Sequence, residues 1–264
     1  THMDTATTIE AGLYAPILGH APDEVAPDCD QVVVLDDVLL DEDTQQIAPP
    51  DTSMMQLMGR LGNLLMANGR DDRQYAWTRG QTVLLRLVNA SNARYWDVYL
   101  EDHALTVVGT DGGFLEEPYA VESVVLAPGE RYMVVVEATG EPGQSYRLMN
   151  KRFQLHEEHG DMIEVDPLGN GDNPVATFVY GEGEVTGTGW VQPAPDVPAW
   201  GQAVENLGHH WLLEEDMMGG TVTIDGAVWP DVPVVRTEHL VDTTFEVENA
   251  SEMHHPFHIH GNRF

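Results

Sequence analysis

The sequence has a single cysteine, Cys29, so no disulfide can form within the chain and cysteine usage says nothing about the redox compartment. Positive charge is scarce as well: 12 basic residues, among them one lysine, Lys151, stand against 44 acidic residues. Nucleic-acid binding needs basic patches that face phosphate, and this shortage excludes it. No apolar run approaches the about 20 residues that cross a bilayer, so no membrane span is expected.

The acidic residues give a formal net charge of −32 and are spread along the chain rather than gathered in a tail. Self-repulsion at such a charge disfavours the compact state unless salt screens it, over about 8–10 Å at 0.1–0.15 M. We interpret the composition as an adaptation to high salt. An ordinary acidic surface on a secreted protein is the alternative.

Short apolar stretches separated by turn residues fill most of the chain and predict an antiparallel β-sandwich. The expected strands are Gln31–Leu35, Gln81–Asn89, Tyr95–Leu100, Val121–Leu126, Tyr132–Val136, Val175–Tyr180, Trp211–Met218, Thr221–Ile224 and Thr243–Val247. Turns are expected at Asp111–Gly113 and Asp225–Gly226. Met54–Met66 is the exception, because its apolar residues recur at intervals of three and four and predict a helix. Residues 21–30 have the proline and aspartate content of a linker, which would include Cys29.

The last eleven residues, His254–Phe264, are the richest in chemistry. On an extended strand side chains alternate between faces, so His258 and His260 would share one side and His255 would face the other. Neutral imidazole suits copper, zinc, iron and nickel. A histidine-rich terminus or purification remnant is the alternative, but interleaved proline, phenylalanine, isoleucine and glycine are not typical of a tag.

The segment His255-Pro-Phe-His-Ile-His-Gly261 resembles the His-Pro-x-His-x-His-Gly signature of the multicopper oxidases, the laccase-like enzymes. The resemblance implies that His255 binds the type 1 copper, His258 the type 2 copper and His260 a type 3 copper. Residues 4–18 resemble the strand that follows the family's first-domain His-x-His pair, which makes His2 a type 3 ligand unless it belongs to a cloning scar. No catalytic residue beyond these copper ligands is implied.

Three further phrases, at residues 80–91, 109–113 and 127–132, resemble the middle domain of that family, which usually holds no copper. The implied fold is all-β: a cupredoxin-like Greek-key β-sandwich with one complete middle domain and parts of its two neighbours. The expected boundaries are 1–20 for the end of the first domain, 21–182 for the middle domain, 183–208 for a linker and 209–264 for the start of the last domain. His209, His210 and His254 fall outside the matched positions.

The family's fourth copper motif, with its His-Cys-His strand, is absent, and Cys29 has no flanking histidines. A blue-copper site needs a thiolate and two imidazoles, so we interpret the chain as an internal section of a longer, three-domain oxidase and expect it to be inactive alone. The resemblance implies one-electron oxidation of a phenol, an aromatic amine or a metal ion at type 1 copper. Dioxygen would be reduced to water at a trinuclear copper cluster completed by missing parts of the same polypeptide.

Two other functions stay open. A non-catalytic copper carrier or sink would use the three C-terminal histidines alone. A copper nitrite reductase shares the fold, but the His-Pro-x-His-x-His-Gly triplet does not belong to it. The resemblance also implies a secreted, periplasmic or extracellular location, with the leader in a missing N-terminus.

The charge generates a first prediction. Thermal unfolding should move to higher temperature in molar salt than in low salt, because screening removes repulsion between carboxylates. Differential scanning calorimetry in 0.1 M and 2 M KCl measures the shift. Equal midpoints in the two buffers would contradict the high-salt interpretation.

Overall fold

The computed structural model describes residues 5–20, 25–48, 59–153, 166–169, 171–193, 207–216, 220–238, 243–251 and 253–259. These residues form two compact units. The first unit holds the short helix α1 (Thr5–Glu10) and strands β1 to β11, and the second holds strands β12 to β14. Among the described residues no helix is long and apolar enough to cross a membrane.

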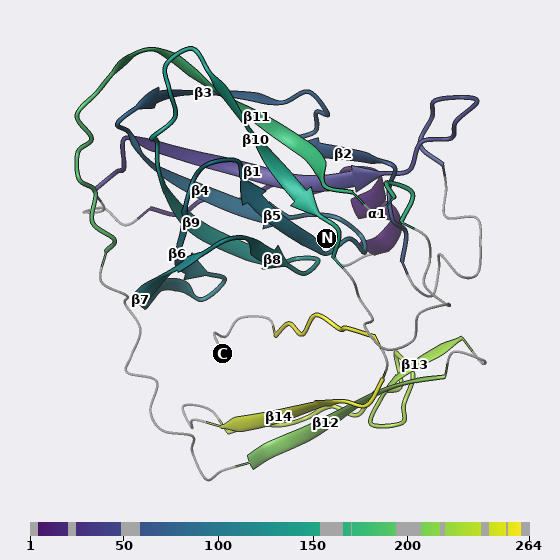
Figure 1. Ribbon diagram of the computed structural model, residues 1–264. Coiled ribbons are helices and arrows are strands. Elements are labelled where there is room, and N and C mark those ends of the chain that lie inside the picture. The colour runs from purple at the N-terminus through teal and green to yellow at the C-terminus, as the bar shows by residue number, and fades with distance from the viewer. Residues whose placement is uncertain are drawn as a thin grey trace. The chain divides into compact units, whose positions relative to one another are not determined.

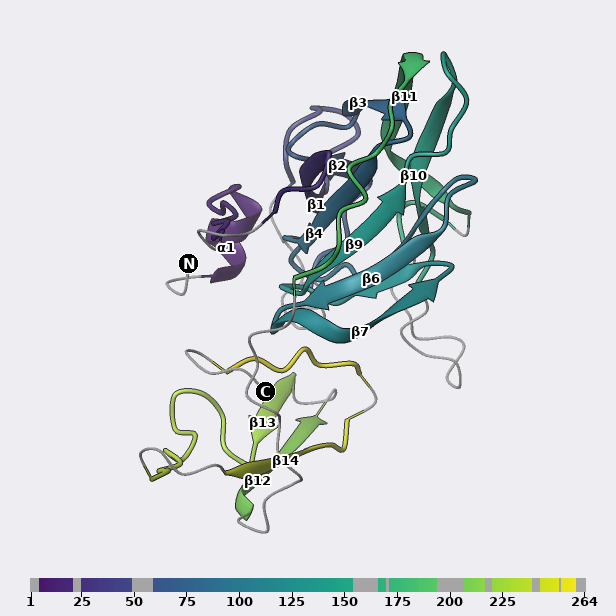
Figure 2. The same ribbon diagram turned by 90° about the vertical axis from the view of Figure 1, so that its left-hand side faces the viewer.

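One layer of the first unit is a six-stranded sheet in the order β2-β1-β4-β9-β6-β7 (Figures 1 and 2). Its strands are β1 (Cys29–Val38), β2 (Leu64–Ala67), β4 (Thr82–Asn89), β6 (Leu105–Thr110), β7 (Gly113–Val121) and β9 (Arg131–Glu137). Neighbouring strands are antiparallel except β1 and β4, which run parallel. A parallel pair requires a crossover between its strands, and here β2 and β3 lie within that connection.

The second layer is a five-stranded sheet in the order β3-β11-β10-β5-β8. Its strands are β3 (Gln74–Arg79), β5 (Trp96–Leu100), β8 (Val124–Leu126), β10 (Ser145–Lys151) and β11 (Asn173–Glu184). It also contains one parallel pair, β3 with β11. The two layers face each other, and the chain crosses repeatedly between them, which is the all-β sandwich expected from the sequence.

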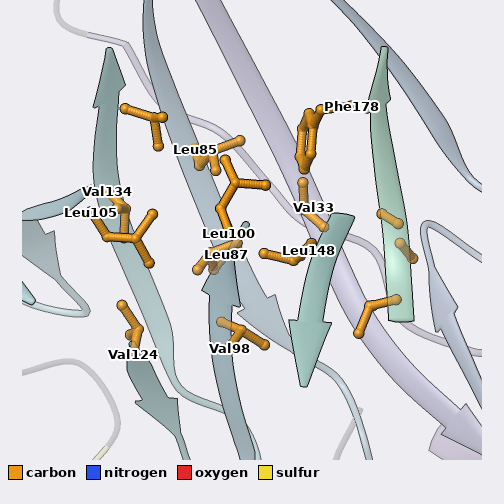
Figure 3. Close-up of a cluster of buried hydrophobic side chains, with 14 of the residues drawn as sticks. Val33, Leu85, Leu87, Val98, Leu100, Leu105, Val124, Val134, Leu148 and Phe178 are labelled. Carbon is orange, nitrogen blue, oxygen red and sulfur yellow. The ribbon is translucent and has the colours of Figure 1, made fainter. Parts of the chain in front are cut away.

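Side chains that point inward from both layers build one hydrophobic core (Figure 3). Alternation places them there: in β5 the exposed fraction falls at every second residue, with Trp96 and Val98 at 0%. Phe178 packs on Trp77 with ring centroids 4.1 Å apart. Each large apolar side chain buried in this way contributes about 1.5–3 kcal/mol, so the packing of the two faces holds the first unit together.

Three local expectations were wrong. Residues 64–67, inside the expected helix, form strand β2, where the exposed fraction alternates as in any half-buried strand; residues 54–58 lie outside the described part. Cys29 belongs to β1 and not to a linker, because Asp30 and Val32 pair with β4. Residues 5–10, expected in a strand, form helix α1.

The second unit is a three-stranded sheet in the order β13-β12-β14, formed by β12 (Leu207–Asp216), β13 (Thr221–Ile224) and β14 (Thr244–Asn249). β12 runs antiparallel to β13 and parallel to β14. None of its described side chains is buried to the degree of the first unit's core. A sheet of this size lacks the apolar burial that sustains an independent domain.

A buried arginine ties the loops of the first unit together. Arg94 donates from Nε to Asp37 Oδ2 at 2.8 Å, from Nη1 to Asp166 Oδ2 at 2.7 Å and from Nη2 to the Gly62 carbonyl at 2.8 Å. The side chains of Arg94 and Asp37 are 3% and 0% exposed. Burial raises the pKa of Asp166, but the hydrogen bond and charge of Arg94 outweigh it and leave that pKa lowered.

Removing the Arg94 guanidinium should lower the stability of the folded state strongly. We expect Arg94→Met to lower the free energy of unfolding by about 3–5 kcal/mol, because the Asp37 carboxylate stays buried without a positively charged partner and keeps only the Gly62 N–H as a donor. The control is Arg147→Met, which removes the exposed pair with Glu101 and should cost less than about 1 kcal/mol. Urea denaturation compares them, and equal losses would show that Arg94 is not a buried anchor.

Candidate metal centre

The histidine segment follows β14, and its described residues, 253–259, belong to no strand (Figure 1). Exposure alternates along it: His255, Phe257 and Ile259 are half-buried, and His254, Pro256 and His258 are exposed. A period of two is that of an extended chain, and it places His255 and His258 on opposite sides, the arrangement that strand parity predicts. His2 and His260 lie outside the described residues.

The expected strand pairing at the motif is therefore not seen among the described residues. In the first unit the strand that follows β4 is β5, and it pairs antiparallel with β10 on one side and β8 on the other. The described residues of the second unit contain three strands, with no counterpart of β10 or β8. An extended segment without neighbours has no ladder to join.

Aromatic packing attaches the motif to β12. The ring of Phe257 lies 5.5 Å from that of Trp211, centroid to centroid. Trp211 also stacks on Phe245 of β14 at 4.8 Å and meets His209 edge-on at 5.4 Å. Aromatic pairs at these separations contribute about 0.5–1.5 kcal/mol each beyond their buried area. Phe257 thus fixes the chain between the two histidines of the motif.

His255 itself is held from one side. Its Nε2 lies 2.8 Å from the Ser251 hydroxyl oxygen. Among the described residues Nδ1 has no hydrogen-bond partner. One ring nitrogen is engaged and the other is open, which fits an imidazole that serves as a metal ligand.

The other histidines of the second unit have different partners. His209 Nε2 lies 2.7 Å from Asp225 Oδ2, and His210 Nε2 lies 3.0 Å from Glu248 Oε2. Both residues fall outside the motif, and the sequence interpretation that neither is a ligand stays a prediction. The N–H of Leu212, first, and then His209 lower the pKa of Asp225.

Donors do not converge further in the described part of the chain, where no group of three His, Cys, Asp or Glu side chains is placed to hold a metal. Cys29 lies in the first unit and is half-buried; burial, and then the charges of Asp30 and Asp28, raise the pKa of its thiol. A thiol that keeps its proton is a poor metal ligand. The imidazole of His255 suits copper, but it accounts for only one donor of a blue-copper site.

The second unit repeats one corner of the first. The order β13-β12-β14 matches β2-β1-β4, with the same antiparallel and parallel pairings. A two-residue turn with positive φ at both positions directly follows β2 and β13. In Asn68 and Gly69 the φ values are 50° and 73°, and in Asp225 and Gly226 they are 55° and 72°. Glycine and short polar residues tolerate this conformation best.

The polar side chain of each turn makes the same bonds to the central strand. Asn68 Oδ1 accepts from the Val34 N–H at 2.7 Å, and Asp225 Oδ1 accepts from the Leu212 N–H at 2.8 Å. The main-chain N–H of Asn68 donates to the Val34 carbonyl and that of Asp225 to the Leu212 carbonyl, both at 2.8 Å. Asn68 and Asp225 are therefore equivalent positions.

The tripeptide Asn-Ala-Ser ends the parallel strand in both units, at residues 89–91 and 249–251. The alanine N–H donates to Leu35 in one unit and to Leu213 in the other, at 2.8 and 2.9 Å. After this corner the serine hydroxyl contacts a ring nitrogen in both units. Trp96 Nε1 donates to Ser91 Oγ at 2.9 Å, and His255 Nε2 lies 2.8 Å from Ser251 Oγ. The structural partners of His255 were missed from the sequence, although the repeated tripeptide was a usable signal.

The two-layer sandwich with its parallel strand pairs defines the class as cupredoxin-like. The chain aligns with a multi-copper oxidase from Pseudomonas thermotolerans at a TM-score of 0.70 and 19% identity, over 94% of this chain and 57% of that one. A multicopper oxidase from Campylobacter jejuni aligns at 0.67 and 22%, over 88% and 50%. At these identities the likeness concerns the fold alone.

Residues 32–181, more than half of the chain, match the family model described as multicopper oxidase, and the chain belongs to that family. Multicopper oxidase LPR1 homolog 5 of Oryza sativa subsp. japonica is 30% identical over 191 residues, 67% of this chain and 29% of that protein. Cell division protein FtsP of Xenorhabdus nematophila is 41% identical over 144 residues, 52% and 29%. The chain thus spans about three tenths of the length of these curated relatives.

The repeat generates a substitution test in the second unit. Asp225→Asn should keep the turn, because Asn68 already fills the equivalent position, whereas Asp225→Ala leaves the Leu212 N–H without its acceptor and should cost about 1 kcal/mol. Hydrogen exchange at the Leu212 amide is the measurement. Faster exchange in the asparagine variant than in the alanine variant would disprove the equivalence.

Proposed function

We propose that the chain supplies a section of a multicopper oxidase that couples one-electron substrate oxidation at a type 1 copper to reduction of dioxygen to water at a trinuclear copper cluster. Family membership and the His-Pro-x-His-x-His-Gly triplet support the proposal. The observation that carries it is the placement of His255 and His258 on opposite sides of one segment. Two adjacent but separate copper centres require that placement.

In this proposal His255 binds type 1 copper, His258 type 2 copper, and His260 and His2 type 3 copper. Copper, when bound, supplies the one-electron chemistry. The protein's part would be to hold imidazoles at fixed positions, to leave Nδ1 of His255 available for a metal, and to fix the intervening Phe257 on Trp211.

The domain boundaries are part of the same proposal: 1–20 from a first domain, 21–182 as a copper-free middle domain, 183–208 as a linker and 209–264 as the start of a last domain. The missing apolar core of the second unit supports this, since a sheet without buried side chains needs further strands. The remaining copper ligands would come from other parts of the polypeptide. A secreted or periplasmic location and adaptation to high salt complete the proposal.

The reducing substrate is proposed by class only: a phenol, an aromatic amine or a metal ion. A laccase-like oxidase from Ochrobactrum sp., 26% identical at a TM-score of 0.55 over 75% of this chain and 44% of that one, is described as active towards lignin model compounds. That relative favours a phenolic substrate. The Campylobacter jejuni protein is described as a metallo-oxidase, which keeps a metal ion among the candidates.

A second function is favoured by a different observation. The relatives named cell division protein FtsP reach 41% identity, and none is named an oxidase. A non-catalytic cupredoxin protein, which binds copper as a carrier or sink or uses the fold without electron transfer, would fit them. The carrier and the oxidase both need copper on the terminal histidines, and oxygen consumption by the longer protein separates them.

Copper binding by the 264-residue chain tests the proposal. Competition against a Cu(II) chelator should give at least about a tenfold weaker affinity for His255→Ala and for His258→Ala, because each removes a ligand. His254→Ala is the matched control, as it removes an adjacent exposed imidazole outside the motif. An equal loss in all three variants would mean nonspecific binding to a histidine-rich terminus.

The same loaded chain should show no intense absorption near roughly 600 nm, since it offers no thiolate to a type 1 site. Cys29→Ser should leave the spectrum unchanged. A strong blue band that this substitution abolishes would place Cys29 in a copper site and overturn the ligand assignment.

A further inference from the structure

The orientation of the Asn249 side-chain amide is determined by its main-chain neighbours. The Ser251 N–H, which can only donate, faces one amide atom at 3.1 Å, so that atom is Oδ1. The Met253 carbonyl, which can only accept, faces the other at 2.7 Å, so that atom is Nδ2. No flipped amide satisfies both contacts.

This orientation decides where the Ser251 hydroxyl proton goes. The oxygen has two acceptors within reach, Asn249 Oδ1 at 2.7 Å and the Met253 carbonyl at 3.1 Å. Both compete for the single hydroxyl proton, and the Met253 N–H donates to the same oxygen at 3.3 Å. With that proton directed to Asn249 or Met253, the hydroxyl oxygen is left to accept in its 2.8 Å contact with His255 Nε2.

The first unit gives independent support. There Ser91 faces Trp96 Nε1, a group that can only donate. The Ser91 N–H donates to Asn89 Oδ1 at 2.9 Å, as the Ser251 N–H does to Asn249. In the equivalent corner, therefore, the serine oxygen is an acceptor for a ring N–H by necessity.

We propose that Ser251, fixed by Asn249, is a positioning residue for His255: its hydroxyl accepts the Nε2–H and leaves Nδ1 as the nitrogen that binds copper. The tautomer and ring orientation stand on hydrogen bonding alone, and only the identity of the metal rests on the proposed function. The partner on the far nitrogen of a ligand histidine fixes the ring and raises its basicity.

Nitrogen-15 NMR of the metal-free chain, at a pH where imidazoles are neutral, tests the tautomer. His255 should show a protonated Nε2 and an unprotonated Nδ1, assigned with His255→Gln. Ser251→Ala should shift both resonances toward the averaged values of a mixed tautomer, and Ser251→Thr, which keeps a hydroxyl, should restore them. Ser91→Ala removes the equivalent hydroxyl in the first unit and should leave the His255 resonances unchanged.

The tautomer readout supports the proposal if Ser251→Ala alone averages the resonances. It overturns the proposal if Nδ1 carries the proton, or if Ser251→Ala and Ser91→Ala behave alike. Misfolding of a variant is recognised from the amide spectrum, and the threonine rescue then decides the outcome.

A second experiment, in which Cu(I) is added to the chain, distinguishes failure of this inference from failure of the proposed function. Cu(I) added anaerobically should move the Nδ1 resonance of His255 while Nε2 keeps its proton, and Ser251→Ala should weaken Cu(I) binding about 10- to 100-fold. Movement of Nε2 in place of Nδ1, or a loss below twofold, overturns the positioning role while copper binding stands. A tautomer as expected, with no response of either nitrogen to Cu(I), keeps the role of Ser251 and removes the copper assignment.

Discussion

The parallel pairing of a strand with one much further along the chain is the constraint on which both units depend. It joins β1 to β4 in the first unit and β12 to β14 in the second, with Leu35 opposite Asn89 and Leu213 opposite Asn249. Each pair delivers an Asn-Ala-Ser corner to the same end of its sheet. Because the alanine N–H bonds the neighbouring strand, the asparagine and serine side chains are placed by backbone register.

The fold was predictable and the site only in part. Strand alternation located β4, β5 and β9 because their inward residues are uniformly apolar. The same method failed at β2, since spacings of three and four in Met54–Met66 fit a helix while Leu65 and Ala67 also satisfy a period of two. Periodicity over a few residues does not separate these cases, and only pairing with β1 decides.

At the site, the motif identified His255 and His258 as candidates but not what holds them. Ser251 lies four residues before His255, and its role depends on a turn that brings its hydroxyl back to the ring. A turn of this kind has no signature in residue spacing alone. The duplicate corner at residues 89–91 carries that information, and it is read only once the two strand pairs are known to be equivalent.

The placement of the charged side chains explains how so acidic a chain can form a buried apolar core. Arginines of the first unit are used in ion pairs: Arg60 with Glu10, Arg79 with Glu141, Arg86 with Asp30, Arg94 with Asp37 and Asp166, Arg131 with Asp111 and Arg147 with Glu101. Among the described residues Asp36 and Asp37 are the buried acidic side chains. Burial raises the pKa of Asp36 to about 6, so this carboxyl favours folding below its unfolded pKa and loses that contribution as pH rises through 6. Exposed carboxylates such as those of Asp72 and Glu141, both 68% exposed, can be screened by salt.

The comparison of Trp96 with His255 shows how one corner serves two purposes. In the first unit the serine satisfies an indole N–H, and Trp96 is 0% exposed within a core closed by the second sheet. In the second unit an imidazole takes the serine, and His255 is half-buried. An indole has no second nitrogen, so the hydrogen bond completes its polar requirements and the ring can be sealed in apolar packing. An imidazole bound in the same way retains a lone pair, which needs a partner of its own. The serine of each corner therefore contacts a ring nitrogen in both units, although Trp96 begins strand β5 five residues after Ser91 and His255 follows Ser251 by four residues in a segment outside any strand.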